Sequence, residues 1–280
     1  MTLLRDISNN LEQWGTMMSV YDKLTTFSWY LYSPKFYGEF WRCFRKQFDP
    51  TIPSYSMFER ISAIKWCEER AVDSKSAFYK ITNQRDYIDF LEEYKDVIEA
   101  GMNKEGFTRE VGGAADLEFI YNISNYLKAT KVIETGVAFG WSSLAILLSL
   151  KDRANSSLIS VDIPYKGRED IVGMVVPSDL RAKWRLILKP DREGVPLALQ
   201  SMDQLDMCHY DSDKTYAGRV STYDLLWNSL RKDGVFISDD IGDNLAFRDY
   251  CQSINKTPIV FKLEENRLTR TKYVGVLVKE

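Results

Sequence analysis

Histidine and paired cysteines are almost absent from this sequence, and that absence excludes several kinds of site. His209 is the one histidine among 280 residues, and the four cysteines are widely separated and form no C-x-x-C pair. A zinc site built from several histidines, or an H-E-x-x-H motif, is therefore impossible. Any metal would be held mainly by oxygen ligands, which favours hard ions such as Mg²⁺, Mn²⁺ or Ca²⁺. Scattered cysteines also suit a reducing compartment, so we expect a cytoplasmic protein.

An excess of basic charge and long apolar runs are missing as well. The formal net charge is −3, whereas a protein that binds nucleic acid or an anionic membrane needs a concentrated basic surface. We therefore expect neither partner. The longest strongly apolar stretch, around residues 144–150, is far too short to span a bilayer. The first residues also lack the basic and apolar segments of a secretory signal.

Glycine and strand-like alternation are scarce in the first 105 residues, where aromatic side chains are abundant instead. Of the 37 aromatic residues in the chain, 20 lie in the first 100. Disordered segments are poor in aromatics, so we expect a folded, helical N-terminal region over residues 1–105, interrupted at Asp49–Pro53. Packing against the main domain is the role we favour for it, and a substrate lid or a dimer contact stays open.

Apolar strands and helices alternate along residues 106–280, which we expect to form the main domain. Strands are expected at residues 132–135, 158–162, 185–188, 206–210, 235–238, 259–263 and 273–278. Such alternation predicts a parallel sheet with helices on both faces. The last two strands have no helix between them and should pair antiparallel. The predicted fold is α/β, a doubly wound, mostly parallel seven-stranded sheet with an antiparallel terminal hairpin.

The turn after the first expected strand is punctuated by glycine, in the pattern Glu134-x-Gly136-x-x-x-Gly140. This is not the G-x-G-x-x-G pattern of dinucleotide-binding proteins. Glycine allows a sharp turn and a close approach of a ligand to the backbone, here at the start of a helix. Asp162 follows Gly136 by 26 residues at the end of the next strand. A carboxylate there can accept both hydroxyl protons of a ribose, or it can cap a turn ahead of Pro164.

Acidic residues stand at or just past the carboxyl ends of all five expected parallel strands: Glu134, Asp162, Asp191, Asp211 with Asp213, and Asp239 with Asp240. Ligands of open α/β sheets bind at these ends. The fourth and fifth strands should be neighbours, which would bring Asp211, Asp239 and Asp240 together. A divalent cation would offset the repulsion between these carboxylates. The alternative is that Asp239 or Asp240 caps the helix that starts near Asp243.

These motifs resemble those of a known family. Val132–Ser143 resembles the first motif of class I S-adenosylmethionine-dependent methyltransferases, and Ser160-Val161-Asp162 is similar to their ribose-binding acid. Residues 205–216 and 230–241 are similar to a branch of metal-dependent O-methyltransferases that act on sugars of antibiotics and related small molecules. Over residues 108–280, the resemblance implies a Rossmann-like methyltransferase fold, S-adenosylmethionine as cofactor, Mg²⁺ or another divalent cation, and a hydroxyl acceptor on a sugar or other small molecule.

The resemblance also implies roles for single residues. The cofactor would be bound by Glu134, Gly136 and Ser142 at its methionine part, by Asp162 at its ribose, and by Asp191 near its adenine. Thr135 and Gly140 of the same turn would also bind it. The metal ligands would be Asp211, Asp239 and Asp240. Asp213 matches the position of the general base of this branch, and Lys214 stands where the branch often has histidine. Both are therefore candidate catalytic residues, although Lys214 removes any histidine-based proton transfer.

Two other functions stay open at the level of sequence. The chain could be a catalytically inactive binding or scaffold protein that keeps the methyltransferase fold. Lys214 and the aromatic N-terminal region are the reasons for this hypothesis. A nicotinamide oxidoreductase is disfavoured by the missing G-x-G-x-x-G pattern and by the terminal hairpin. The sequence does not identify the methyl acceptor, nor whether the chain forms a homo-oligomer. His209, at a strand end, is expected to be structural.

Overall fold

The computed structural model describes residues 57–107, 116–163, 169–263 and 271–280, with five isolated positions between 28 and 41. The chain divides into two compact units, one of residues 1–53 with 165–167 and one of residues 54–164 with 168–280. Most of the first unit lies outside the described residues, and so does the expected helical structure of residues 1–56. The sheet and its helices all belong to the second unit.

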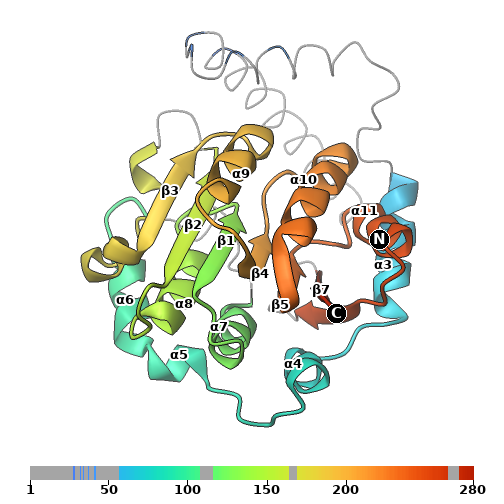
Figure 1. The fold of residues 1–280 in the computed structure, drawn as a ribbon, viewed down its shortest axis with the longest axis horizontal. Helices are drawn as coiled ribbons and strands as arrows, with labels where there is room; N and C mark the ends of the chain where they lie inside the picture. The colour runs from blue at the N-terminus through green and yellow to red at the C-terminus, as the bar shows by residue number, and fades with distance from the viewer. Residues whose placement is uncertain are drawn as a thin grey trace, which may run out of the picture. The chain divides into compact units, whose positions relative to one another are not determined.

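The sheet has seven strands in the order β3-β2-β1-β4-β5-β7-β6 (Figure 1). Their bounds are β1 Lys131–Thr135, β2 Ser157–Asp162, β3 Trp184–Leu188, β4 Leu205–Tyr210, β5 Leu230–Ser238, β6 Ile259–Leu263 and β7 Lys272–Val278. β1 to β5 pair in parallel, whereas β7 runs antiparallel to both β5 and β6. The predicted α/β sheet with an antiparallel terminal hairpin is thus confirmed.

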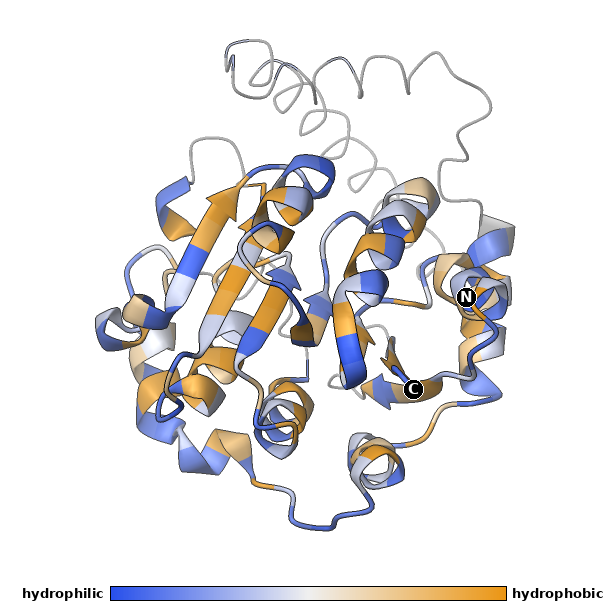
Figure 2. Ribbon diagram, viewed as in Figure 1, coloured by the Kyte–Doolittle hydropathy of each residue, from blue (hydrophilic) through white to orange (hydrophobic). Residues whose placement is uncertain are grey.

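Alternate residues of the strands face two separate cores, one on each side of the sheet. One core contains α7 (Leu117–Tyr126) and α8 (Trp141–Leu150) and takes Val132, Leu158, Met207 and Val235. The other contains α9 (Asp191–Leu199), α10 (Tyr216–Ser229) and α11 (Ala246–Ser253) and takes Ile133, Ile159, Cys208 and Phe236. Burial on both faces requires nearly continuous apolar strands, and the strands are largely apolar in Figure 2.

Residues 57–102 are largely helical, as expected, and belong to the same unit as the sheet. They form α3 (Met57–Glu68), α4 (Ser74–Thr82), α5 (Phe90–Glu93) and α6 (Lys95–Met102). Phe78 and Phe90 are buried in the core of α7 and α8. Val72, between α3 and α4, forms a parallel bridge with Phe261 of β6. The division of the chain at residues 105 and 106 stays a prediction.

Polar residues mark the starts of two helices. α9 begins at Asp191, and an acidic residue is favoured in the first turn of a helix. α10 begins at Tyr216, and Thr215 caps it by accepting a hydrogen bond from the Gly218 amide at 3.1 Å. Among the described helices, none is long and apolar enough to cross a membrane.

Candidate active site

The glycine turn after β1 lies directly against the residue that follows β4. Gly136 has a φ of +80°, a conformation that L side chains rarely adopt. Its amide donates a hydrogen bond to the Val161 carbonyl at 2.9 Å, and a Cβ at this position would overlap the Asp211 carbonyl oxygen. Gly140, with a φ of +94°, starts α8 and would carry a Cβ only 2.7 Å from the Gly173 Cα. Both glycines are therefore required by the close packing of the turn.

Asp162, at the end of β2, binds the backbone of the same turn. Its Oδ2 accepts hydrogen bonds from the amides of Ala138 at 3.0 Å and Val137 at 3.2 Å. Burial raises the pKa of Asp162 to about 7, and the two amide donors oppose that rise. The side chain thus lies at the turn where a cofactor is expected, and its contact with a ribose stays a prediction.

Glu134 is fully buried and faces the protein interior. One carboxylate oxygen accepts hydrogen bonds from the hydroxyls of Ser143 and of Ser160, the latter at 2.8 Å. The other oxygen lies 3.6 Å from His209 Nδ1, an ion-pair distance too long for a hydrogen bond. Burial lowers the pKa of His209, and Glu134 more than reverses that effect, so the pKa is raised. Glu134 therefore ties β1 to α8, β2 and β4, and its predicted contact with a cofactor stays a prediction.

A second polar network links β1, β4 and α9. The Ser212 hydroxyl bonds the Thr135 Oγ1 at 2.8 Å and the carboxylate of Asp191. Burial raises the pKa of Asp191 to about 6, and the Ser212 hydroxyl opposes that rise. Ser142, also a predicted cofactor-binding residue, is buried in the first turn of α8. These residues surround the glycine turn, as expected for a ligand site at the carboxyl edge of the sheet.

Asp211, Asp239 and Asp240 meet beside this turn. One carboxylate oxygen of each lies within 4.8 Å of the others. The register of the sheet explains the cluster, since Tyr210 of β4 pairs with Ser238 of β5 and the acids follow directly. Asp211, Asp239 and Asp240 are called the acid cluster below. Binding of a divalent ion by this cluster stays a prediction.

Lys214 inserts its ammonium group into the acid cluster. Nζ donates a hydrogen bond to the Asp211 carboxylate and lies 3.0 Å from Asp240 Oδ2. Burial alone would lower the pKa of Lys214, but the carboxylates of Asp211 and Asp240 raise it above its usual value. The lysine therefore carries a positive charge inside the cluster. The sequence singled out Lys214 as unusual but gave no indication that its side chain turns this way.

The members of the acid cluster differ in their electrostatics. Burial raises the pKa of Asp239 above its ordinary range, and Asp211 and Asp240 add to the rise. Burial would also raise the pKa of Asp240, but the Lys214 ammonium holds it below its usual value. Asp239 Oδ1 is buried and has no hydrogen-bond partner among the described residues. Asp239 is therefore better able than Asp240 to hold a proton.

Arg219 is a site residue that the sequence reading missed. It is fully buried in α10 and donates hydrogen bonds to the carbonyls of Asp239 at 3.1 Å and Asp240 at 3.0 Å. It also bonds the Tyr223 hydroxyl at 3.0 Å. Asp240 has a φ of +51°, so the guanidinium holds the acids in an unusual backbone conformation. The sequence pattern that could have indicated a buried arginine is the spacing of Arg219 and Tyr223, which lie four residues apart on one helix face.

Asp213 points to the start of α10. Its Oδ1 accepts a hydrogen bond from the Thr215 amide at 2.9 Å, and a Cβ on Gly218 would overlap the carboxylate. A negative charge is favourable at a helix N-terminus, so Asp213 stabilises α10 in this structure. Its role as a general base stays a prediction.

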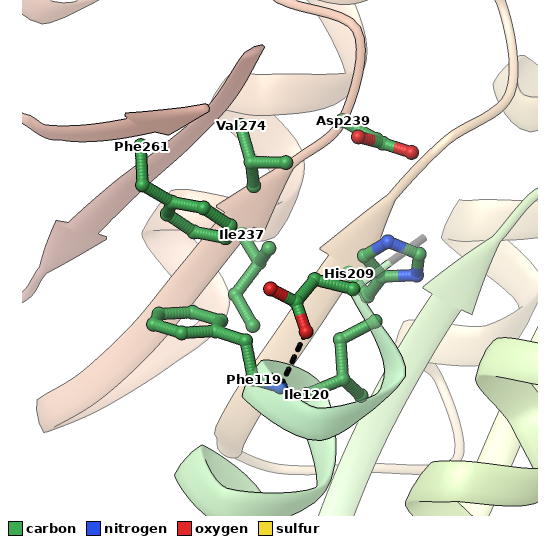
Figure 3. Close-up of a pocket in the computed structure, with 8 residues that line it drawn as sticks. Phe119, Ile120, His209, Ile237, Asp239, Phe261 and Val274 are labelled. Atoms are coloured by element: carbon green, nitrogen blue, oxygen red, sulfur yellow. Dashed lines mark hydrogen bonds between the residues drawn. The ribbon is translucent and has the colours of Figure 1, made fainter. Parts of the chain in front are cut away.

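Behind the acid cluster, Asp239 and His209 lie at one end of a mostly apolar hollow (Figure 3). The rest of the lining is apolar apart from Asp116, and consists of Phe119, Ile120, Ile237, Phe261 and Val274. The hollow is too narrow to hold a water molecule. It therefore isolates Asp239 and His209 from solvent on this side and is not a binding pocket.

Comparisons with known proteins agree with this geometry. Residues 133–241 match a family model described as a methyltransferase domain, and this range contains every site residue predicted from the sequence. A comparison with curated protein sequences gives no match. The match starts within β1 and ends at Ile241, just after the acid cluster.

Solved structures resemble the chain at low sequence identity. Cofactor-bound Rv0187 from MTB is 15% identical, with a TM-score of 0.51, over 73% of this chain and 96% of that one. A provisionally assigned O-methyltransferase from Klebsiella pneumoniae is 11% identical, with a TM-score of 0.51, over 77% of this chain and 100% of that one. The O-methyltransferase from Bacillus cereus in complex with SAH is 12% identical, with a TM-score of 0.49, over 76% of this chain and 100% of that one. The first two likenesses show that the fold is shared.

Proposed function

We propose that this chain is a class I S-adenosylmethionine-dependent methyltransferase, in keeping with the methyltransferase-domain match over residues 133–241, and that it transfers the methyl group to a hydroxyl oxygen of a small molecule. A sugar or related polyol is the expected acceptor. The proposal includes neither a nucleic-acid nor a membrane partner, and a cytoplasmic location and a homo-oligomer stay predictions. The provisional description of the Klebsiella pneumoniae structure as an O-methyltransferase supports transfer to oxygen.

One observation carries this proposal: the acid cluster and the glycine turn are in direct contact through Gly136 and Asp211. Methyl transfer is an in-line displacement, so the enzyme must hold the accepting oxygen next to the methyl group. An acceptor bound at the acid cluster would lie beside a cofactor bound at the turn. Carboxylates and an ammonium group suit a polyhydroxylated acceptor, because they accept and donate hydrogen bonds to hydroxyls.

S-adenosylmethionine supplies an electrophilic methyl group on a sulfonium sulfur when it is bound. The residues of this chain must then position a hydroxyl and take its proton, because a neutral sugar hydroxyl is a poor nucleophile. The resemblance assigns the proton to Asp213. Asp239 is a second candidate, since it is buried, has a raised pKa and has an oxygen without a partner among the described residues. The two residues can be separated experimentally.

The fit of Mg²⁺ to this site depends on Lys214. Without Lys214, the three clustered carboxylates would suit a hard divalent ion. One of them, Asp239, has a buried oxygen that lacks a partner among the described residues. Asp211, Asp239 and Asp240 would hold the ion, which would lower the pKa of a coordinated hydroxyl. The Lys214 ammonium, however, already bonds two of these carboxylates. Mg²⁺ dependence stays a prediction that does not fit the cluster while Lys214 is in place.

The proposed function is tested by incubating the full chain with S-adenosylmethionine and a panel of sugars, polyols and phenols, and by measuring S-adenosylhomocysteine. The expected result is turnover with a hydroxyl compound and a product methylated on oxygen. A product methylated on nitrogen or carbon would overturn the proposal. Absence of both turnover and binding of S-adenosylhomocysteine in calorimetry would favour the inactive scaffold protein.

A further inference from the structure

The acid cluster already has an internal cation among the described residues. Lys214 lies in the short segment between β4 and α10, and its ammonium reaches back to Asp211 and to Asp240 Oδ2, the latter at 3.0 Å. Its side chain is 26% exposed and that of Asp240 is 24% exposed. The ion pair is thus largely withdrawn from solvent, where charge interactions are screened less than at a surface. The attraction therefore holds the ammonium in the cluster.

The backbone that carries Lys214 is fixed on both sides. Asn244 Nδ2 donates a hydrogen bond to the Lys214 carbonyl at 2.8 Å, and Thr215, the next residue, caps α10. The Asp213 carboxylate accepts from the Thr215 amide. These contacts fix the backbone from which the lysine side chain reaches the acids. Its position is therefore built into the fold of this segment.

A divalent ion and the ammonium group require the same oxygens. Mg²⁺ binds carboxylate oxygens at about 2.0–2.1 Å, and the Lys214 Nζ lies at hydrogen-bond distance from oxygens of Asp211 and Asp240. Two cations so close together would repel each other strongly. Binding of the ion would require Lys214 to leave the cluster.

We propose that Lys214 is the resident cation of the acid cluster, takes the place of a divalent ion, and makes methyl transfer independent of metal. An ammonium has three N–H donors, of which the carboxylates of Asp211 and Asp240 use two, leaving the third for the oxygen of the acceptor. During transfer, the bond between that oxygen and the methyl carbon forms while the sulfur–methyl bond breaks and its electron pair stays on sulfur. The hydroxyl proton passes to a carboxylate. This assignment deepens the proposed function and rests on it for the turnover step.

The test compares the full chain with Lys214→Met, which keeps the length of the side chain and removes its charge. Mn²⁺ alone is the probe, and free Mn²⁺ is measured by electron paramagnetic resonance. We expect no Mn²⁺ binding at the cluster of the native chain and a gained site in Lys214→Met. The gained site should disappear in the double variant Lys214→Met with Asp239→Asn. Equal binding by the native chain and Lys214→Met would overturn the proposal, and so would the lack of a gain.

Turnover gives a second readout. The native enzyme should be fully active in excess chelator and unaffected by Mg²⁺, whereas Lys214→Met should lose activity by on the order of 100-fold, the typical loss for one donor at a reacting oxygen, and recover part of it with Mg²⁺. Loss of native activity in chelator, restored by Mg²⁺, would overturn the proposal. The Mn²⁺ measurement needs no turnover, so failure of the proposed function would not hide its result.

Two controls keep the result interpretable. Lys256→Met removes a surface lysine that pairs with Glu280 at 2.6 Å, and should change neither Mn²⁺ binding nor turnover. Lys214→Gln is a second variant, which keeps hydrogen-bond donors at this position without the charge and should also gain Mn²⁺ binding. It replaces Lys214→Met in the test if Lys214→Met fails to fold. Circular dichroism and binding of S-adenosylhomocysteine confirm that each variant is folded.

Discussion

Gly136 and Asp211 are in such close contact that any side chain at position 136 would overlap the Asp211 carbonyl oxygen. The contact joins the turn after β1 to the residue that follows β4, and the Asp211 amide also donates to the Thr135 carbonyl at 2.8 Å. The expected cofactor site and the acid cluster therefore form one structural unit. A change on one side of this contact is transmitted to the other.

The first prediction concerns this contact. Gly136→Ala should lower affinity for S-adenosylhomocysteine by at least about tenfold, which corresponds to about 1.4 kcal/mol. A left-handed conformation costs an L residue about 1–2 kcal/mol, and the overlap with Asp211 adds to this cost. Isothermal titration calorimetry measures the affinity.

Gly106→Ala is the matched control for Gly136→Ala. Gly106 also has a positive φ, +87°, but its Cβ would meet only the end of the Met174 side chain, at 4.0 Å. Gly106→Ala should have a lower melting temperature because of its unfavourable backbone conformation, and it should bind S-adenosylhomocysteine with the affinity of the native chain. If both variants lost affinity equally, the contact with Asp211 would not be the reason.

The second prediction concerns pH and Asp162. Burial raises the pKa of Asp162 to about 7, well above the ordinary value for an aspartate, so the folded chain holds this proton more tightly than the unfolded chain. The resulting stabilisation is present below about pH 4 and is lost as the pH rises through about 7. Asp162→Asn, which is neutral throughout and keeps an oxygen for the turn amides, should lack this loss.

The cofactor-free native chain should therefore lose stability relative to Asp162→Asn between about pH 4 and pH 7, by up to a few kcal/mol, since one pKa unit corresponds to about 1.4 kcal/mol. Urea unfolding followed by circular dichroism at several pH values measures the difference. If the free energy of unfolding changed with pH in the same way for both proteins over this range, a raised pKa at Asp162 would be contradicted.

The third prediction concerns Arg219 as a positioning residue. Arg219→Lys should lower kcat by more than it changes KM, because a lysine lacks the planar guanidinium whose two terminal nitrogens bond the carbonyls of Asp239 and Asp240 separately. Stability should fall by about 1–3 kcal/mol, since buried carbonyls lose hydrogen bonds to a charged donor. Steady-state kinetics and thermal unfolding measure the two effects.

Arg231→Lys is the control for a general loss of stability. Arg231 pairs with Asp206 at 2.6 Å at the start of β4, the opposite end of the strand from the acid cluster. This variant should lose stability without a selective fall in kcat. A similar kinetic loss in both variants would show that Arg219 acts only through stability.

The order of strands and helices could be predicted because apolar periodicity reports which faces of each element are buried. The proximity of Asp211, Asp239 and Asp240 followed from the same reasoning, since parallel neighbours end at one edge of the sheet. The inward direction of Glu134 and the insertion of Lys214 depend on side-chain rotamers and on the path of short loops. Periodicity carries no information about either. The buried Arg219 was missed because a single charged residue in a helix usually faces solvent.

The last prediction separates the two candidate proton acceptors. Asp239→Asn should lower kcat by about 100-fold or more, the range typical for loss of a general base, because Asp239 has a raised pKa and an oxygen that lacks a partner in the described part of the chain. Asp213→Asn should lose less activity, since its carboxylate bonds the Thr215 amide at the start of α10 and an asparagine can accept the same hydrogen bond. Single-turnover kinetics at saturating cofactor measures the chemical step in both variants. A larger loss in Asp213→Asn, with unchanged thermal stability, would instead assign the proton to Asp213 as the family resemblance implies.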